Sequence, residues 1–265
     1  MPKLSANLSF LFPDVAFAER FARAADAGFR GVEYLFPYDY PVDELAHLLR
    51  AYRLQQVLYN LPAGDWQAGE RGIACLPGRE AEFREGVERA LEYARLLDCR
   101  QINCLAGIAP TGVPDAEIRA AFVANVRHAA SRLGEHDIRL LIEPINSRVD
   151  MPGFWLDTPR KAEALMTEIA ETNLWLQYDV YHAQIMEGDL ARTIERNIGR
   201  IAHIQLADNP GRHEPGTGEI NFPFLFRVLG HLGYRGWLGC EYRPLSADAN
   251  GTEQGLRWAT DWPPG

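Results

Sequence analysis

Short apolar runs alternate with longer amphipathic segments along most of the chain. In the amphipathic segment EAEFREGVERALEYARLLD, Phe83, Val87 and Leu91 recur at the spacing of one helix face. Glycines such as Gly28 and Gly134 separate these segments from the apolar runs, as is usual where a helix ends. The apolar runs predict eight strands, at residues 4–8, 31–35, 55–59, 101–105, 139–143, 174–179, 201–206 and 237–242.

The order of these elements favours an α/β fold with a parallel sheet. Strands that alternate with helices form parallel βα units, and both an open doubly wound sheet and a closed barrel are built in this way. No GxGxxG motif follows the first strand, and the count of eight strands favours a closed barrel. No linker or low-complexity segment divides the sequence. We therefore predict a single-domain (β/α)8 TIM barrel over residues 1–265.

One predicted connection, at residues 60–79, is unusually long for a compact domain. Its sequence, NLPAGDWQAGERGIACLPGR, is rich in glycine and proline and has no helical period. Structureless loops of about 20 residues are usually functional or disordered. Trp66, Ile73 and Leu76 give this segment enough apolar surface to pack. We predict a lid beside the active site, with a passive surface excursion as the alternative.

Composition and charge narrow the range of partners. The chain is 47% hydrophobic and 24% charged, which is ordinary for a globular protein with a large core. Its net charge of −9 argues against a nucleic-acid partner, since phosphate binding relies on clustered Lys and Arg. A small anionic substrate needs only one or two local cations, so the acidic balance does not exclude it.

The sequence also predicts a location. The N-terminal segment MPKLSANLSFLFPDVAF lacks the apolar core and cleavage site of a secretory signal, and no apolar stretch reaches the ~18 residues of a membrane span. The four cysteines have no CxxC spacing; they are Cys75, Cys99, Cys104 and Cys240. We expect a cytoplasmic protein with free thiols and no membrane partner.

The last four predicted strands carry, near their ends, side chains that offer an oxygen to a metal ion. The residues are Glu143 in IRLLIEPIN, Asp179 in LWLQYD, Gln205 in IAHIQLAD and Glu241 in WLGCE. Active sites of TIM barrels lie at the carboxyl-terminal ends of the strands, so we expect these groups to converge. Three close carboxylates repel one another unless they are protonated or share a cation. The all-oxygen set favours Mg²⁺ or Mn²⁺, although any one of these residues alone would be an ordinary solvated group.

Other polar residues are candidates for substrate binding. His182 follows Asp179 by three residues, where it would bind a substrate oxygen or serve as a cap. Arg212, in the loop ADNPGRHEPGTGEINF, suits a substrate carboxylate through bidentate pairing. Asn7 and Asn60, near other strand ends, are further candidates for holding that carboxylate.

These motifs together carry a family resemblance. QYDVYHAQ, HIQLADNPGRHEPGTGEIN and GWLGCEYRP, with RGVEYLFPYDY, INCLAG and LLIEPIN, resemble the hydroxypyruvate isomerase family within the xylose-isomerase-like barrel superfamily. The resemblance covers nearly the whole chain. It implies a metal-assisted isomerisation of the aldose–ketose type that interconverts hydroxypyruvate and 2-hydroxy-3-oxopropanoate. Such a reaction moves a proton between neighbouring carbons through an enediol, and two Glu side chains beside the substrate can carry that proton.

The resemblance also implies roles for the site residues. It places a divalent metal, Mg²⁺ or Mn²⁺, on Glu143, Asp179, Gln205 and Glu241. Glu143 and Glu241 would double as the acid/base pair. The substrate-binding histidine and arginine of the superfamily fall on His182 and Arg212. Many members of the superfamily have a histidine where this chain has Gln205, so one ligand position departs from the pattern.

Related activities stay open as alternatives. A 2-oxo-tetronate isomerase performs the same proton shift on a four-carbon acid, although NLPAGDW, ADNP and PGTGE look closer to hydroxypyruvate isomerase. A ketose 3-epimerase would use the same two Glu in a wider pocket. An endonuclease IV-like enzyme fits poorly, because the chain is acidic and lacks that family's many histidine ligands. A barrel that only binds a ligand would need neither a metal nor opposed carboxylates. The oligomeric state is open, although exposed helices of such barrels often pair.

Overall fold

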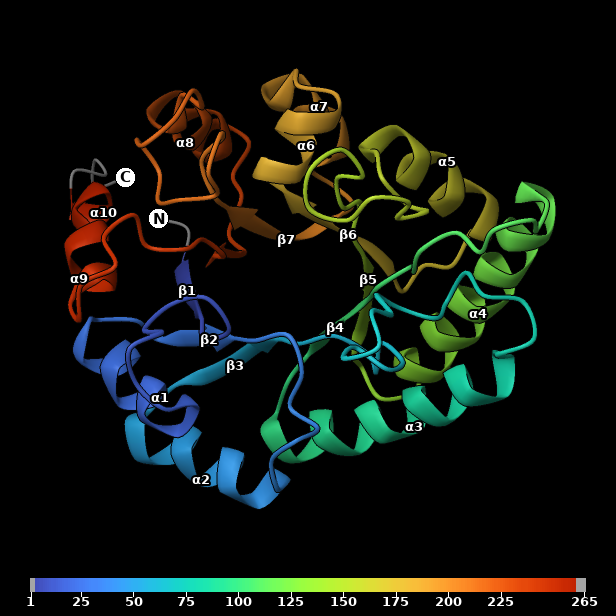
Figure 1. Cartoon of the computed structure of the whole chain (residues 1–265), viewed down its shortest axis with the longest axis horizontal. Coiled ribbons are helices and arrows are strands. Elements are labelled where there is room, and N and C mark those ends of the chain that lie inside the picture. The colour runs from blue at the N-terminus through green and yellow to red at the C-terminus, as the bar shows by residue number, and fades with distance from the viewer. Residues whose placement is uncertain (1–2, 261–265) are drawn as a thin grey trace.

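A computed structural model describes residues 3–260, which form a ring of eight strands surrounded by helices (Figure 1). The strands are β1 (Lys3–Asn7), β2 (Gly31–Glu33), β3 (Gln55–Leu58), β4 (Gln101–Cys104), β5 (Arg139–Ile142), β6 (Leu174–Asp179), β7 (Ile201–Leu206) and β8 (Trp237–Cys240). Their order in the sheet is β3-β2-β1-β8-β7-β6-β5-β4, and neighbouring strands pair in parallel. Between β3 and β4, Asn60 and Asn103 form an isolated parallel bridge, and the N–H of Leu61 donates to the carbonyl oxygen of Asn103 at 2.8 Å. The ring is thus nearly closed, which confirms the predicted TIM barrel.

The helices cover the outside of this ring. They are α1 (Phe17–Asp26), α2 (Val42–Tyr52), α3 (Glu80–Leu97), α4 (Asp115–Gly134), α5 (Pro159–Ile169), α6 (Val180–Met186), α7 (Leu190–Asn197), α8 (Phe222–His231), α9 (Gly251–Gly255) and α10 (Arg257–Thr260). Helix α3 buries Phe83, Val87 and Leu91, as their spacing predicts. The start of α5 is fixed by Thr158, whose hydroxyl oxygen accepts a hydrogen bond from the N–H of Lys161. The predicted single domain over residues 1–265 includes residues 1–2 and 261–265, which lie outside the described residues, so the domain boundary stays a prediction.

Six of the eight strands end one or two residues earlier than the apolar runs predict, whereas β6 and β7 end as predicted. The sequence places Glu143 and Glu241 inside strands, but each is the first residue after its strand, β5 or β8. Pro144 follows Glu143 and has no N–H to donate, so the ladder cannot continue there. Asp179 ends β6, and Gln205 lies beside it in the register of β7. All four side chains therefore still lie at the carboxyl-terminal end of the barrel.

The long segment at residues 60–79 packs closely against the residues that follow β4. The backbone N–H of Cys75 donates to the carbonyl oxygen of Ala106 at 2.8 Å, and Ile73 is buried. Gly72 has φ +116, and a Cβ there would lie 2.4 Å from the carbonyl oxygen of Leu105, so glycine is required for this approach. Trp66 meets Phe36 edge to face at 5.0 Å. The segment at residues 60–79 is therefore packed against the barrel. Its function as a moving lid stays a prediction.

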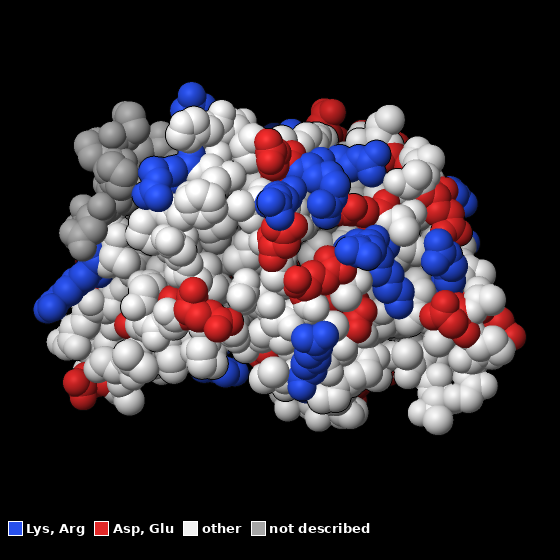
Figure 2. Space-filling model, turned by 90° about the horizontal axis from the view of Figure 1, so that it is seen from above, with Lys and Arg blue, Asp and Glu red and all other residues white. Residues whose placement is uncertain are grey.

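Charged side chains of both signs share the outer surface. Seen from the edge that carries α5 to α8, basic and acidic side chains are interspersed (Figure 2). There, Arg196 Nη2 and Glu163 Oε1 form an ion pair at 2.9 Å, a kind of surface contact that contributes only about 0–1 kcal/mol to the stability of a fold.

Within residues 3–260, no helix has the length and apolar character needed to cross a membrane. The four cysteines are buried and free, as predicted, while cytoplasmic location and oligomeric state stay predictions.

Candidate active site

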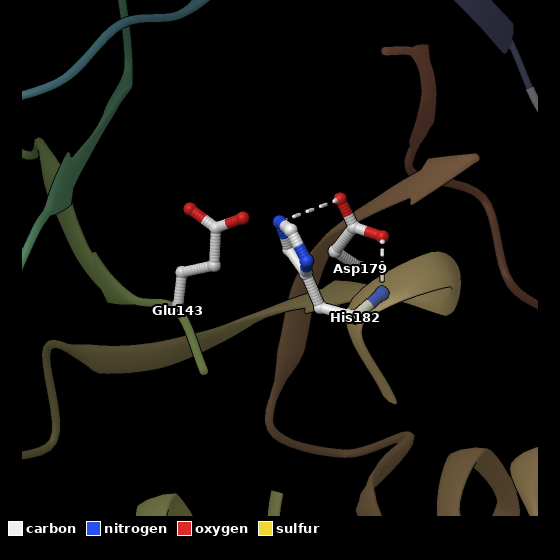
Figure 3. Close-up of side chains that lie close together, drawn as sticks. All are labelled: Glu143, Asp179 and His182. Atoms are coloured by element: carbon white, nitrogen blue, oxygen red, sulfur yellow. Dashed lines mark hydrogen bonds and ion pairs between the residues drawn. The ribbon is translucent and has the colours of Figure 1, made fainter. Parts of the chain in front are cut away.

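A cavity of about 690 Å³ opens at the carboxyl-terminal end of the barrel strands. Seven predicted site residues line it: Asn7, Asn60, Glu143, His182, Gln205, Arg212 and Glu241. The eighth, Asp179, is buried beside His182 (Figure 3). Trp66 of the 60–79 segment also borders the cavity. The structure therefore brings every predicted site residue to one end of the barrel.

Glu143, Asp179 and His182 form a buried group in this site. One ligand-capable atom from each lies within 4.8 Å of the others, and Figure 3 shows the imidazole between the two carboxylates. Asp179 Oδ1 accepts hydrogen bonds from the backbone N–H groups of Tyr181 (2.7 Å) and His182 (3.1 Å) at the start of α6. Among the described residues, Asp179 Oδ2 has no hydrogen-bond partner and lies 3.7 Å from His182 Nε2. A buried carboxylate oxygen without a partner is costly, and a bound cation would satisfy it.

Burial and repulsion increase the proton affinity of the carboxylates. Burial raises the pKa of Glu143 well above its usual value, and the charges of Glu241 and Asp179 raise it further. Burial also raises the pKa of Asp179. It raises the pKa of Glu241 to about 8, although the positive charge of Arg212 acts in the opposite direction. A divalent cation would offset this repulsion, and carboxylate oxygens are its usual ligands. The residues present therefore fit a divalent metal site.

Glu241 is held from both sides. Its Oε2 accepts hydrogen bonds from Asn7 Nδ2 (2.7 Å) and Gln205 Nε2 (2.5 Å), and its Oε1 accepts one from Arg212 Nη2 (2.6 Å). The carboxamide oxygen of Gln205 accepts a hydrogen bond from Gln177 Nε2 at 2.6 Å. Gln205 thus presents its nitrogen to Glu241, and its function as a metal ligand stays a prediction.

The guanidinium of Arg212 lies between two carboxylates and two aromatic rings. It donates to Glu241 and, through Nη1, to Asp150 Oδ1 at 3.1 Å. Its guanidinium carbon lies 4.9 Å from the ring centre of Phe10 and 5.2 Å from that of Tyr181. The side chain is nearly fully buried, and its backbone has φ 57, so the loop holds it in one place. This fixed cation borders the cavity in which the sequence predicts an anionic substrate.

The hydrogen bonds around His182 define its protonation state. The carboxamide oxygen of Asn146 accepts from the backbone N–H groups of Val149 (2.9 Å) and Asp150 (3.0 Å), which turns its NH₂ group toward His182 Nδ1 at 2.7 Å. With Nδ1 accepting at this shorter contact, the neutral ring carries its proton on Nε2, although Arg212 Nη2, also a donor, lies 3.5 Å from Nε2. Burial lowers the pKa of His182 well below its usual value, and the charge of Arg212 lowers it further. His182 is therefore a neutral N–H donor, which suits a substrate oxygen better than a cation.

Asn60 reaches the acidic group indirectly. Asn103 Nδ2 donates to Asn60 Oδ1 at 3.0 Å and to Glu143 Oε2 at 2.8 Å. Asn60 therefore orients the amide that holds Glu143, and its own amide group borders the cavity. Its contact with substrate stays a prediction.

Several residues that complete the site escape prediction from the sequence: Glu33, Asn103 and Asp150. Glu33 is buried at the end of β2, and in the sequence it lies in the middle of the apolar run GVEYL. A carboxylate within an apolar run is a related signal to the one that identifies Glu143. Asn103 lies in the apolar run QINC, where one buried amide is a weaker signal. Asp150 lies in a loop after β5, and only the fold brings it to Arg212.

Comparison with known proteins agrees with this geometry. Residues 21–262 match the model of the family described as xylose isomerase-like TIM barrel. The chain is 53% identical to hydroxypyruvate isomerase of Escherichia coli (strain K12) over 258 residues, which cover 97% of this chain and 98% of that protein. It is 48% identical to 2-oxo-tetronate isomerase of Cupriavidus necator, over 97% of both chains. It is 43% identical to a putative hydroxypyruvate isomerase of Homo sapiens, over 97% of this chain and 93% of that protein.

Solved structures extend the comparison. A Brucella melitensis protein described as AP endonuclease, family 2, superposes with a TM-score of 0.94 at 48% identity and full coverage of both chains. A 3-keto-D-glucoside 4-epimerase from E. coli superposes with a TM-score of 0.81 at 21% identity, over 98% of this chain and 99% of that chain, a likeness that concerns the fold alone. The chain belongs to the xylose isomerase-like TIM barrel family and, within it, to the hydroxypyruvate isomerase family.

Proposed function

We propose that this chain is an isomerase that interconverts hydroxypyruvate and 2-hydroxy-3-oxopropanoate. The observation that carries the proposal is the pair of buried carboxylates, Glu143 and Glu241, which border one cavity and whose pKa values are both raised by burial. The identity of 53% to a hydroxypyruvate isomerase over nearly the full length supports the choice of substrate. Aldose–ketose isomerisation needs two such groups, because a proton leaves one carbon and another proton is added to its neighbour.

The proposed reaction moves the carbonyl group from C2 to C3 of the three-carbon acid. A base removes a proton from C3, and the electron pair of the C–H bond forms the C2–C3 double bond of an enediolate. An acid then returns a proton to C2 while the hydroxyl proton on O3 passes to O2, which leaves an aldehyde at C3. C3 is oxidised and C2 is reduced within the same molecule, so the reaction needs no external oxidant or reductant.

Glu143 and Glu241 are the residues that we assign to the two proton transfers. A carboxyl group with a pKa of about 8, as burial gives Glu241, is populated in both protonation states near neutral pH. Glu143 is held by Asn103, and Glu241 by Asn7 and Gln205, so neither carboxylate needs to reorient at the moment of transfer.

Arg212 and His182 are the proposed substrate-binding groups. The guanidinium of Arg212 is suited to the substrate carboxylate, and the Nε2–H of His182 to a carbonyl or hydroxyl oxygen. Asn7 and Asn60, which also border the cavity, are further candidates for contacts with the carboxylate. The aromatic ring of Trp66 borders the same cavity and limits the access of water.

We propose Mg²⁺ or Mn²⁺ as the cofactor. The carboxylates of Glu143, Asp179 and Glu241 would hold it. Gln205, the fourth predicted ligand, would join them only with its carboxamide turned, because its nitrogen donates to Glu241 and its oxygen accepts from Gln177. When bound, such an ion polarises the carbonyl group and stabilises the negative charge of an enediolate. Asp179 Oδ2, which accepts no hydrogen bond from the described residues, supports this assignment.

A second candidate function is the isomerisation of 2-oxo-tetronate. It is favoured by the 48% identity to a 2-oxo-tetronate isomerase and by a cavity of about 690 Å³, which leaves room for a fourth carbon. The chemistry would be identical, since the extra hydroxymethyl group lies beyond the two reacting carbons.

A rate comparison tests the proposed substrate. Purified protein is incubated with hydroxypyruvate or with 2-oxo-tetronate in the presence of Mg²⁺ or Mn²⁺, and the aldehyde product is measured by NMR. We expect kcat/KM for hydroxypyruvate to exceed that for 2-oxo-tetronate by at least about tenfold. A difference of this size is usual when two substrates differ by one small group in the same pocket. A reversed ratio would assign the chain to the four-carbon acid, and no turnover of either acid would refute the proposed function.

A further inference from the structure

We propose that Glu33 is a positioning residue that fixes the catalytic carboxylate of Glu241 through two shared carboxamides, those of Asn7 and Gln205. The inference rests on the proposed function, because it takes Glu241 as one of the two proton-transfer groups. Glu33 itself is assigned no contact with the reacting carbons. Its effect on the reaction passes through the orientation of Glu241.

Glu33 is buried at the wall of the same cavity, and both of its carboxylate oxygens make polar contacts. Oε2 accepts from Ser5 Oγ at 2.6 Å and lies 2.9 Å from His203 Nε2. Gly239, on β8, leaves room for this carboxylate, because a Cβ there would lie 2.3 Å from Glu33 Oε1. The barrel wall is therefore shaped around a carboxylate that has no part in the predicted metal site.

The other oxygen of Glu33 is shared with Glu241 through two amides. Glu33 Oε1 accepts from Gln205 Nε2 at 2.9 Å and from Asn7 Nδ2 at 3.3 Å. The same two nitrogens donate to Glu241 Oε2. Each NH₂ group has two hydrogens, so one can point to each carboxylate. Two donors therefore bridge two acidic groups that would otherwise repel each other.

The opposite ends of both carboxamides are occupied as well. Asn7 Oδ1 accepts from the backbone N–H of Ser9 at 3.0 Å, and Gln205 Oε1 accepts from Gln177 Nε2 at 2.6 Å. A flipped amide would turn its oxygen toward Glu33 and Glu241 and its NH₂ toward other donors, which is unfavourable at every contact. Without the acceptor on Glu33, the carboxamides of Asn7 and Gln205 lose one of the hydrogen bonds that orient them. Their NH₂ groups then no longer point to Glu241 Oε2 in one fixed direction.

A double-mutant cycle tests whether Glu33 acts through Glu241. We expect Glu33→Leu to lower kcat for the preferred acid by about 30-fold with KM changed less than about threefold, because hydrogen bonds to charged groups have effects of this size. Glu33→Gln, which keeps an acceptor of lower strength, is expected to lower kcat by about fivefold. In the Glu241→Gln background, each change at Glu33 should alter the residual kcat by less than about twofold. Ser5→Ala, which removes a bond only from the far oxygen, is the matched control and should leave kcat within about twofold.

Equal losses in both backgrounds would overturn the inference, because they would mean a general structural effect. If Glu33→Leu does not fold, the cycle with Glu33→Gln gives the same decision. A crystal structure of the Glu33 variant provides a readout without substrate. We expect the carboxamides of Asn7 and Gln205 to turn away from Glu241, and unchanged side chains would overturn the inference. If the wild-type protein turns over neither acid, the proposed function fails, and the crystal structure alone decides the position of Glu241.

Discussion

Replacing Glu241 with Gln is expected to lower kcat for hydroxypyruvate by about 10³-fold, within the usual range for a group that transfers a proton to or from carbon. The same loss is expected for Glu143→Gln. A carboxamide has the shape of a carboxyl group but cannot carry the proton at neutral pH. KM should change by less than about tenfold, because we propose that Arg212, and not these residues, binds the substrate carboxylate. Initial rates at saturating substrate measure the effect.

Two controls make this result specific. Glu92→Gln, an exposed change on α3, keeps the same chemical substitution away from the site and should leave kcat unchanged. The double variant at Glu143 and Glu241 should be little slower than either single variant, since the two groups act in one sequence of proton transfers. Near wild-type rates in both single variants would contradict the assignment of the acid/base pair.

Removal of divalent metal is expected to lower kcat by about 100-fold or more, because a cation at a developing enediolate is worth several kcal/mol. The protein is treated with EDTA, its metal content is checked by elemental analysis, and the rate is measured before and after addition of Mg²⁺ or Mn²⁺. Addition should restore the rate and raise the melting temperature, because an ion that binds the folded state stabilises it. The physical reasons are the repulsion among the three carboxylates and Asp179 Oδ2, which accepts no hydrogen bond within residues 3–260.

Asp179→Asn separates metal binding from proton transfer. This variant keeps the acceptor for the backbone N–H groups of α6 but removes the charge, so the protein should need a higher metal concentration for half-maximal activity. A control with EDTA and an excess of Mg²⁺ excludes inhibition by the chelator itself. Full activity of protein shown to be free of metal would contradict the metal assignment.

The barrel was predictable because its signal is local. Apolar runs such as those around Ile102 and Ile204 alternate with segments of helical period, and each element can be recognised without its neighbours. The exact strand ends were less predictable. Glu143 and Glu241 follow their strands by one residue. Pro144 stops the ladder after Glu143, whereas the N–H of Glu241 still donates to the carbonyl oxygen of Leu206 at 3.2 Å, a contact between two strands that the sequence of β8 alone does not reveal.

The sequence predicts which residues form the site, but it does not predict the hydrogen bonds between them. A carboxylate at the end of an apolar run identifies Glu143 from the sequence, since such a charge is costly without a partner. The orientation of Gln205 depends on Gln177 and Glu33, which come from other strands and give no joint signal in the sequence. The same reasoning applies to Asp150, whose contact with Arg212 joins two loops 62 residues apart.

We propose that a proton, and not a hydride, is transferred to C2 under the control of Glu143 and Glu241. Isomerisation of hydroxypyruvate in ²H₂O, followed by NMR at early times against an enzyme-free control, distinguishes the two. We expect deuterium from solvent at C2 of 2-hydroxy-3-oxopropanoate, because a proton held on a carboxyl group exchanges with water. Product that forms at the full rate without any deuterium at C2 would indicate a direct hydride shift and would refute proton transfer by these two residues.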